Sequence, residues 1–187
     1  VLLSWILPVA VLLIGGFLAT FVLLLGYFNA TKPRILVVHS AAQHSQWAVQ
    51  VDKGMRKALQ RTRRPVSVEW IYLDVSSPAG GRSAVEARAE AMRAIGRTDP
   101  DVLITVDDEA NALVGSTFVG LESPRVLYVS VDRPPAVYGY PGARNVSGIA
   151  DALPWAAIRD ALTDLFGPRP TVAVLGVDND SGRAELD

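Results

Sequence analysis

The stretch Arg34-Ile-Leu-Val-Val38 is a short, uninterrupted apolar run in which β-branched side chains predominate. A run of this kind is typical of a strand that is buried on both faces of a parallel sheet. Similar runs recur along the chain at residues 66–73, 101–106, 125–131, 146–149 and 171–175.

The segments between these runs have apolar residues at helical spacing. In the first segment, Trp47, Val51 and Met55 recur on one helix face, Ser45 is a candidate N-cap and Pro65 ends the pattern. Further helices are predicted over 83–97, from 107 to about 119, and over 155–166. Strands that alternate with such helices predict βαβ units. The predicted fold class is therefore α/β, with a doubly wound parallel sheet and helices on both faces.

The first 31 residues carry no charged side chain. As a helix, residues 1–28 would extend about 42 Å, against roughly 30 Å of hydrocarbon in a bilayer. Trp5 near one end and Tyr27 near the other suit aromatic anchors at the two interfaces. The alternative is a secretory signal peptide, whose apolar region is about 7–15 residues long, and Phe28-Asn29-Ala30 is a poor cleavage site. Residues 1–28 are therefore predicted to be a retained transmembrane anchor in contact with membrane lipid.

Four parts follow from these patterns. After the anchor, residues 29–33 are predicted to be a linker, and residues 34–150 a first α/β lobe. Residues 151–187 are predicted to hold a crossover helix and the start of a second lobe. This second lobe is expected to be incomplete, because the strand predicted at 171–175 leads into a breaker cluster and a helix that is only beginning.

Composition and motifs argue against several classes of function. Lys and Arg number 18 against 19 Asp and Glu, and the net charge of −1 gives no electrostatic support for nucleic-acid binding. The absence of Cys excludes disulfides and thiolate chemistry. Ser40, His39 and Asp107 are a nominal nucleophile, base and acid, but no nucleophile-elbow, phosphate-loop or dinucleotide motif is present. His39 and His44 have no evident third metal ligand. No enzyme activity, catalytic residue, cofactor or metal site is predicted.

In open parallel sheets, ligands bind beyond the carboxyl ends of the strands, near the point where the strand order reverses. Tyr138 and Tyr140, in a Pro- and Gly-rich loop, are equally compatible with cleft aromatics and with structural loop residues. The predicted ligand contacts are the strand-end residues Ser40, Trp47, Asp74, Asp107 and Asp108.

Four of these residues also have a purely structural interpretation. Asp107 and Asp108 suit the N-cap of the following helix. Trp47 belongs to an apolar helical stripe and is more readily a core residue than a stacking wall for a ligand. Asp74 is a typical turn residue at a strand end.

Four segments resemble the ABC-transporter substrate-binding-protein family, which also provides extracytoplasmic sensor domains of membrane-bound signalling proteins. Ile35-Leu-Val-Val-His-Ser40, followed by Trp47, is similar to the family's opening strand and His-Ser motif. Trp70-Ile-Tyr-Leu-Asp74 is similar to its Tyr-Met-Asp segment. Asp101-Val-Leu-Ile-Thr-Val-Asp-Asp-Glu-Ala110 resembles its Asp-Asp segment, and Asn145-Val-Ser-Gly148 its hinge entry. The match covers roughly residues 34–187.

The resemblance implies a type I periplasmic-binding fold, in which two α/β lobes close on a small organic solute such as an amino acid. It further implies a single-pass protein of the bacterial cytoplasmic membrane with its polar domain on the periplasmic side, and a permease or other membrane subunits as partners. Where the family has an aromatic residue, a Pro and a Gly after His-Ser, this chain has Ala41-Ala42-Gln43-His44. The alternative hypothesis is therefore a non-catalytic accessory subunit of a larger membrane complex, with a degenerate solute-binding lobe.

Overall fold

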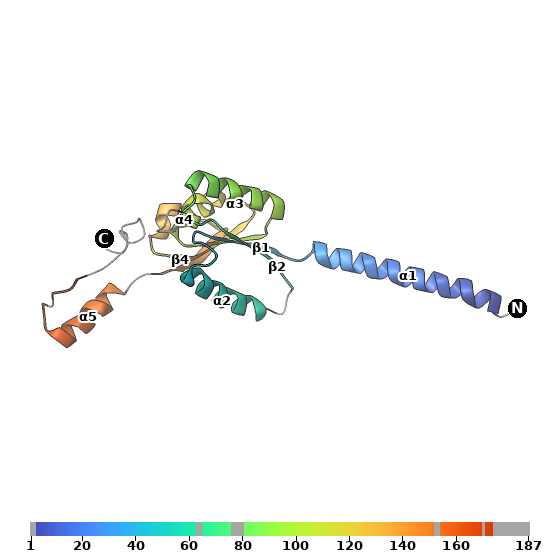
Figure 1. The fold of residues 1–187 in the computed structure, drawn as a ribbon, viewed down its shortest axis with the longest axis horizontal. Helices are drawn as coiled ribbons and strands as arrows, with labels where there is room; N and C mark the ends of the chain where they lie inside the picture. Colours follow the sequence, from blue (N-terminus) through green and yellow to red (C-terminus); the bar gives the residue numbers. More distant parts are fainter. Residues whose placement is uncertain (1–2, 63–64, 76–80, 152–153, 170, 174–187) are drawn as a thin grey trace.

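The elements of the domain alternate along the chain as the sequence predicts (Figure 1). This computed structural model describes residues 3–62, 65–75, 81–151, 154–169 and 171–173. In chain order the elements are α1 (Leu3–Ala30), β1 (Arg34–His39), α2 (Gln46–Gln60), β2 (Ser67–Tyr72), α3 (Ala84–Thr98), β3 (Val102–Val106), α4 (Asp108–Leu113), the 3₁₀ turn η1 (Gly115–Phe118), β4 (Arg125–Val131), the 3₁₀ turn η2 (Pro135–Tyr138), β5 (Val146–Ala150) and α5 (Trp155–Phe166).

The five strands form one parallel sheet in the order β2-β1-β3-β4-β5. The chain passes from β1 outward to β2 and then returns to β3 on the other side of β1. The strand order therefore reverses between β1 and β3, which is the topological switch point of a doubly wound sheet. The predicted α/β class with a parallel sheet is confirmed.

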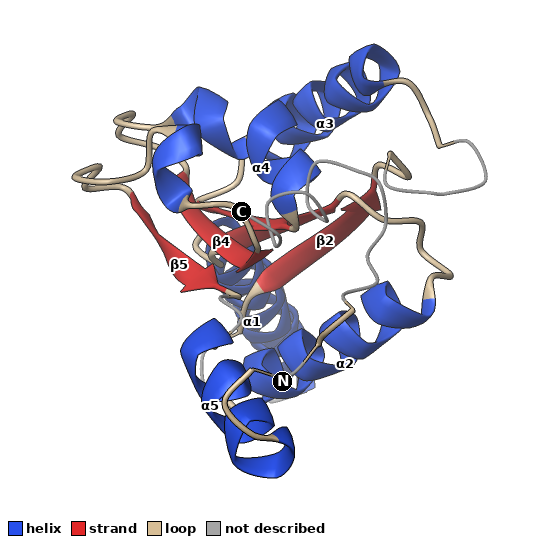
Figure 2. Ribbon diagram, turned by 90° about the vertical axis from the view of Figure 1, so that its left-hand side faces the viewer, coloured by secondary structure: helices blue, strands red, loops and turns tan. Residues whose placement is uncertain are grey.

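The core forms two layers, because successive side chains of a strand point to opposite faces of the sheet. Leu36 and Val38 pack with α3 and α4 on one face, whereas Ile35 and Val37 pack with α2 on the other. Figure 2 shows this division, with α3 and α4 on one side of the sheet and α2 on the opposite side. The interior strand β1 is buried on both faces, which explains why its sequence is a continuous apolar run.

Helix α1 is long and apolar enough to cross a membrane. Residues Ala10–Ala30 have a mean hydropathy of 2.4, and none of this segment is buried against the described part of the chain. The helix continues through Pro8 and ends at Ala30. The connection to β1 is therefore residues 31–33, which is shorter than the predicted linker 29–33.

Two predicted elements differ from the structure. The helix predicted from Asp107 to about Val119 is divided into α4 and η1, because the backbone at Val114 leaves the helical region. Residues 171–173 of the strand predicted at 171–175 are not in a strand, and 174–175 lie outside the described residues, as does the helix start predicted near residue 183. The assignment of 34–150 and 151–187 to two lobes stays a prediction.

Candidate functional site at the carboxyl edge of the sheet

Two polar side chains meet at the switch point between β1 and β3. Ser40 follows β1 and Asp107 follows β3, and the Ser40 hydroxyl donates a short hydrogen bond to Oδ2 of Asp107. The Ser40 amide also donates to the Val106 carbonyl at 3.3 Å, which ties the two strand ends together. Ser40 is fully buried, whereas Asp107 is half-buried. The Asp107 carboxylate is thus held in position while part of it remains accessible.

The backbone is strained at the same edge of the sheet. Asp74, Asp107 and Ser130, which lie at the ends of β2, β3 and β4, have φ angles of 54°, 77° and 52°. Asp107 combines its φ with a ψ of 163°, a region occupied almost only by glycine. Non-glycine residues in such conformations cost about 1–3 kcal/mol each and concentrate at ligand sites. The strain marks this edge as a candidate functional site.

Asp108, the residue after Asp107, has a buried side chain. It is 1% exposed, and its Oδ1 accepts hydrogen bonds from the Tyr138 hydroxyl at 2.5 Å and from the Arg133 amide at 3.3 Å. Burial and the bond to Asp108 raise the pKa of Tyr138 well above its usual value. Carboxylate oxygens of Asp107, Asp108 and Asp132 lie within 4.8 Å of one another, a spacing that suits a cation such as a metal ion or a ligand ammonium group.

Asn111 organises a buried polar cluster beneath the edge. Its Oδ1 accepts hydrogen bonds from the hydroxyls of Thr105 at 2.6 Å and Tyr140 at 2.5 Å, and its Nδ2 donates to the Asp107 carbonyl at 2.8 Å. A Cβ atom at Gly115 would lie 2.3 Å from the Tyr140 hydroxyl, so the cluster requires glycine there. Asn111 was not among the site residues predicted from the sequence. The only available signal was its position four residues after Asp107, one helical turn away.

A second cluster surrounds His39 at the end of β1. Its Nε2 lies 2.8 Å from Oδ1 of Asp52, without the alignment of a hydrogen bond, and its ring stacks on Tyr72 with centroids 5.2 Å apart. Tyr72 donates a short hydrogen bond to Asp52, and burial together with that bond raises the pKa of Tyr72 to about 12. Because His39 contacts Asp52 while Ser40 bonds directly to Asp107, the nominal Ser-His-Asp set is not assembled as a catalytic triad.

Acidification is expected to destabilise the protein through His39. Burial lowers the pKa of this fully buried imidazole, although Asp52 and Asp107 act in the opposite direction. The unfolded chain, with a histidine pKa near 6.5, therefore binds a proton at pH values where the folded chain does not, and stability falls as the pH drops below about 6.5. Melting temperatures of the full-length protein between neutral and mildly acidic pH measure this effect.

The two histidines of the sequence provide a matched control for this experiment. The variant His39→Gln should lose the dependence on pH in this window, whereas His44→Gln, at an exposed position, should retain it. If His39→Gln does not fold, a nitrogen NMR titration of the wild-type imidazoles gives the same information. A His39 signal that titrates at or above the ordinary pKa would contradict the prediction.

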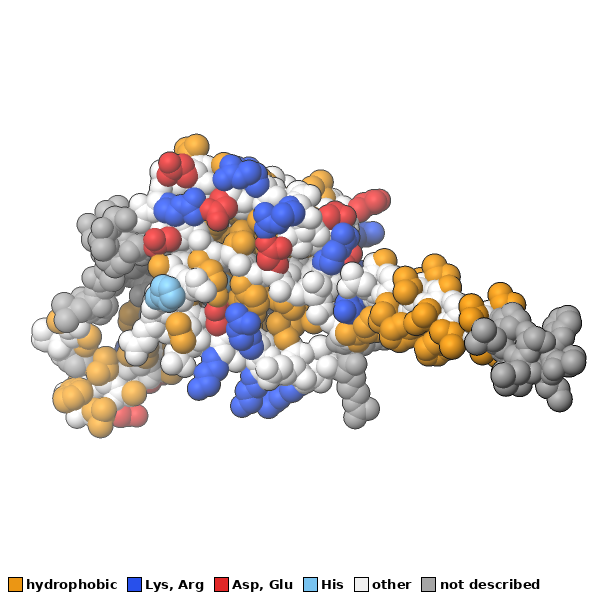
Figure 3. All heavy atoms as spheres, turned by 45° about the vertical axis from the view of Figure 1, so that its right-hand side comes forward, with side chains coloured by type: hydrophobic (Ala, Val, Ile, Leu, Met, Phe, Trp, Pro, Cys, Tyr) orange, Lys and Arg blue, Asp and Glu red, His pale blue; other side chains and the backbone are white. Residues whose placement is uncertain are grey.

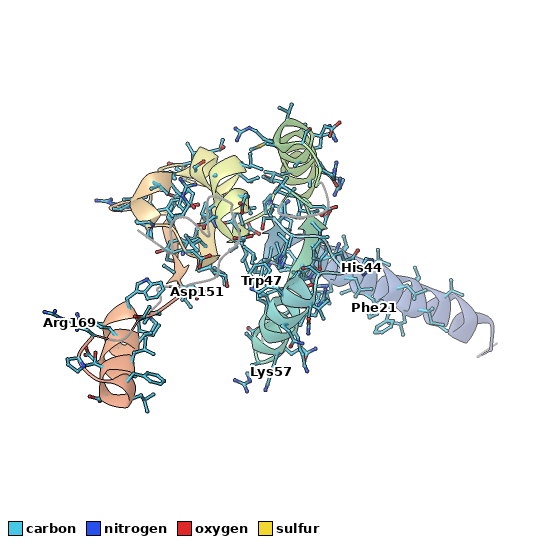
Figure 4. All side chains as sticks on the ribbon, turned by 60° about the vertical axis from the view of Figure 1, so that its left-hand side comes forward. Phe21, His44, Trp47, Lys57, Asp151 and Arg169 are labelled. Atoms are coloured by element: carbon cyan, nitrogen blue, oxygen red, sulfur yellow. The ribbon has the colours of Figure 1, made fainter. Side chains whose placement is uncertain are left out.

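Hydrogen bonds link three of the five predicted site residues, Ser40, Asp107 and Asp108. Asp74 follows the edge strand β2, where the Val75 amide donates to the Ser40 carbonyl at 2.8 Å, and its buried Oδ1 has no hydrogen-bond partner. Trp47, in the first turn of α2 (Figure 4), is 42% exposed and lies edge-on to His39. Its interpretation as a core residue was wrong, because its ring is not part of the apolar cluster in which Val51 and Met55 pack.

The N-cap interpretation of Asp107 is confirmed, since its Oδ1 accepts a hydrogen bond from the Asp108 amide at 2.8 Å. The structure also decides between the two roles that the sequence left for Tyr138 and Tyr140. Tyr138 and Tyr140 are 5% and 4% exposed and serve as structural donors to Asp108 and Asn111. The structure gives the positions of the five residues predicted to contact a ligand, and the contacts themselves stay predictions.

Comparisons with known proteins find solved structures with a similar fold. No protein-family model and no curated protein sequence matches the chain. A solved structure described as an ABC domain in complex with L-Trp, from Streptococcus pneumonia, has a TM-score of 0.50 at 14% identity, over 72% of this chain and 43% of that one. The two structures therefore share a similar α/β fold over this part of the chain.

A second solved structure is the ligand-free, open form of CD0873, a substrate-binding protein with adhesive properties from Clostridium difficile. It has a TM-score of 0.49 at 14% identity, over 73% of this chain and 44% of that chain. The chain thus spans less than half the length of either solved structure. At this level of identity the likeness concerns the fold alone.

Proposed function

We propose that this chain is the first lobe, with the start of the second, of a membrane-anchored extracytoplasmic solute-binding protein or sensor domain. The observation that carries the proposal is the strained carboxyl edge, where Ser40 and Asp107 meet at the switch point of the sheet. This is where open parallel sheets bind their ligands.

The chemistry of the edge favours a small organic solute with a positively charged group, such as the ammonium group of an amino acid. Asp107 is held by hydrogen bonds from Ser40 and from the Asp108 amide, and a carboxylate fixed in this way is a suitable partner for an ammonium group. The exposed ring of Trp47 offers an apolar wall beside the edge. Closure of a second lobe would bury such a ligand, and the closed state would act on a permease or through the anchor.

Helix α1 supports an anchor in a bacterial cytoplasmic membrane, with the polar domain on the periplasmic side. Its exposed apolar surface is long enough to span a bilayer and is unfavourable in water. We expect that protease added to right-side-out spheroplasts digests the polar domain of the full-length protein and leaves an anchor-sized fragment. A domain that becomes sensitive only after permeabilisation would contradict this topology.

A specific observation also favours the accessory-subunit alternative. Ser40 and Asp108 are 0% and 1% exposed and form hydrogen bonds within the chain, as they would in a lobe that no longer binds solute. Purification of the full-length protein from membranes separates the two functions. Bound small molecules favour the solute-binding protein, whereas stoichiometric membrane subunits without a small molecule favour the accessory role.

A further inference from the structure

The solvent-facing side of α2 carries basic side chains without acidic partners. Lys53, Lys57 and Arg61 are exposed, and none of their three side chains has an ion-pair or hydrogen-bond partner within the described residues. Arg56 is engaged on Trp70, with its guanidinium 4.3 Å from the ring centroid. We call Lys53, Lys57 and Arg61 the α2 basic face. Figure 4 shows Lys57 pointing from α2 toward solvent.

The opposite side of the domain has a different arrangement of charge. On the α3 side, Arg82 pairs with Glu90, Arg97 pairs with Glu69, and Arg88 donates to the Leu113 carbonyl. Figure 3 shows red and blue side chains alternating over α3, whereas blue side chains group over α2 on the lower side of the domain. The exposed side of α2 therefore lacks the mixture of acidic and basic side chains that is usual on a soluble surface.

The α2 basic face is next to the end of α1. Because β1 and β2 are parallel, the carboxyl end of α2 lies at the amino ends of the strands, where α1 enters the domain. The Ser67 amide donates to the Pro33 carbonyl at 2.9 Å, and Pro65 lines a surface hollow together with Phe28 and Lys32. The three residues between α1 and β1 span at most about 10 Å. The basic face is therefore held close to any bilayer that α1 crosses.

We propose that the α2 basic face docks onto the anionic phospholipid headgroups of the bilayer in which α1 is embedded. The proposal rests on the membrane anchor of the proposed function and adds a second contact with the same membrane. An open hollow of about 660 Å³ runs along α2 and is lined by Lys53, Arg56 and Lys57, and by the acidic Asp52. The basic side chains outnumber the single carboxylate there.

The expected strength of this contact follows from its charge. A Lys or Arg near an anionic membrane surface favours the docked state by roughly fivefold, so that three together favour it by about 100-fold. Salt weakens the contact, since the Debye length falls from about 30 Å at 0.01 M to about 8 Å at 0.15 M. Docking would set the orientation of the sheet relative to the membrane, with its carboxyl edge facing away from the bilayer.

The test measures the distance between α2 and the bilayer in the full-length protein. Gln60 is exposed on α2, and these 187 residues contain no Cys, so Gln60→Cys accepts a single fluorescent donor in a background without other cysteines. The protein is placed in nanodiscs that carry an acceptor on the lipid headgroups. Energy transfer is compared between neutral phosphatidylcholine discs and discs that also contain phosphatidylglycerol, at low and high salt.

Matched variants identify the residues responsible. Energy transfer should rise with phosphatidylglycerol, fall with salt, and lose its dependence on lipid charge when the basic face is neutralised. A control of equal net charge removes three arginines from the α3 side and should behave as the wild type. The test variant is Lys53→Gln/Lys57→Gln/Arg61→Gln, and the control is Arg82→Gln/Arg93→Gln/Arg97→Gln.

Each other outcome overturns the proposal in a distinguishable way. Transfer that is equal in neutral and anionic discs rejects lipid as the partner of the basic face, while incorporation into the discs still supports the anchor. If the test and control variants lose the dependence of energy transfer on lipid charge equally, the transfer depends on the overall charge of the protein rather than on α2. A protein that fails to enter nanodiscs contradicts the anchor itself, and the docking contact with it.

Discussion

Replacing Asn111 with alanine is expected to lower the free energy of unfolding by about 3–5 kcal/mol. The change leaves the hydroxyls of Thr105 and Tyr140 without their acceptor and the Asp107 carbonyl without one of its donors, all within the protein interior. Each unsatisfied buried group costs about 1–3 kcal/mol. Because domains of this size are stable by only about 5–15 kcal/mol, the loss is large.

Urea denaturation of the full-length protein in detergent, followed by tryptophan fluorescence, measures this effect. The variant Ser116→Ala, which removes one exposed hydroxyl bonded to the Ala112 carbonyl, is the control and should cost little. The double variant Asn111→Ala/Tyr140→Phe should be less destabilised than the sum of its single variants, since it has no tyrosine hydroxyl left to satisfy. Strictly additive losses would show that the hydroxyl finds another partner.

The second large effect concerns Asp107. Asp107→Asn keeps the shape of the side chain and an oxygen that can accept the Asp108 amide, but it removes the charge offered to a ligand ammonium group. Hydrogen bonds to charged groups contribute about 1.5–3 kcal/mol, so the affinity for a bound amino acid should fall roughly 10- to 100-fold. Isothermal titration calorimetry of the full-length protein measures the change.

The control for this variant is Asp164→Asn, at an exposed position of α5, which removes the same charge outside the Asp107 cluster. Its affinity should equal that of the wild type. Unchanged affinity in Asp107→Asn would remove Asp107 from the ligand contacts. Melting temperatures of both variants separate a lost contact from a lost fold.

Local sequence patterns were sufficient to predict the architecture. The apolar run at Arg34–Val38 predicts β1 because this strand is buried on both faces, and α5 begins and ends at the predicted residues Trp155 and Phe166. The positions of Asp74 and Asp107 at strand ends were predictable for the same reason, since they directly follow the apolar runs. Such features depend on neighbours within a few residues in the sequence.

These local patterns could not predict which side chains contact each other. Ser40 and Asp107 are 67 residues apart, and their contact depends on β1 lying beside β3, which only the order of the strands decides. Tyr138 reaches Asp108 across 30 residues because the loop after β4 folds back over α4. Trp47 fits the helical stripe of α2, yet it is not part of the apolar cluster of Val51 and Met55 and remains exposed.

The cluster of His39 with Asp52 and Tyr72 shows the same limitation. Each residue has an ordinary local explanation, on a strand or a helix, and the three meet only because α2 packs across β1 and β2. Their contacts explain why Asp52, the single acidic residue of α2, is buried while the exposed charged side chains of that helix are basic. Sequence spacing alone did not distinguish these two environments.

Whether the carboxyl edge binds a small organic solute is measured by titrating the wild-type full-length protein with each of the common L-amino acids in a calorimeter. We expect saturable binding of at least one of them, at one site per chain, that weakens in Asp107→Asn. No binding of any amino acid to a protein that melts cooperatively, after removal of any copurified small molecule, would contradict it.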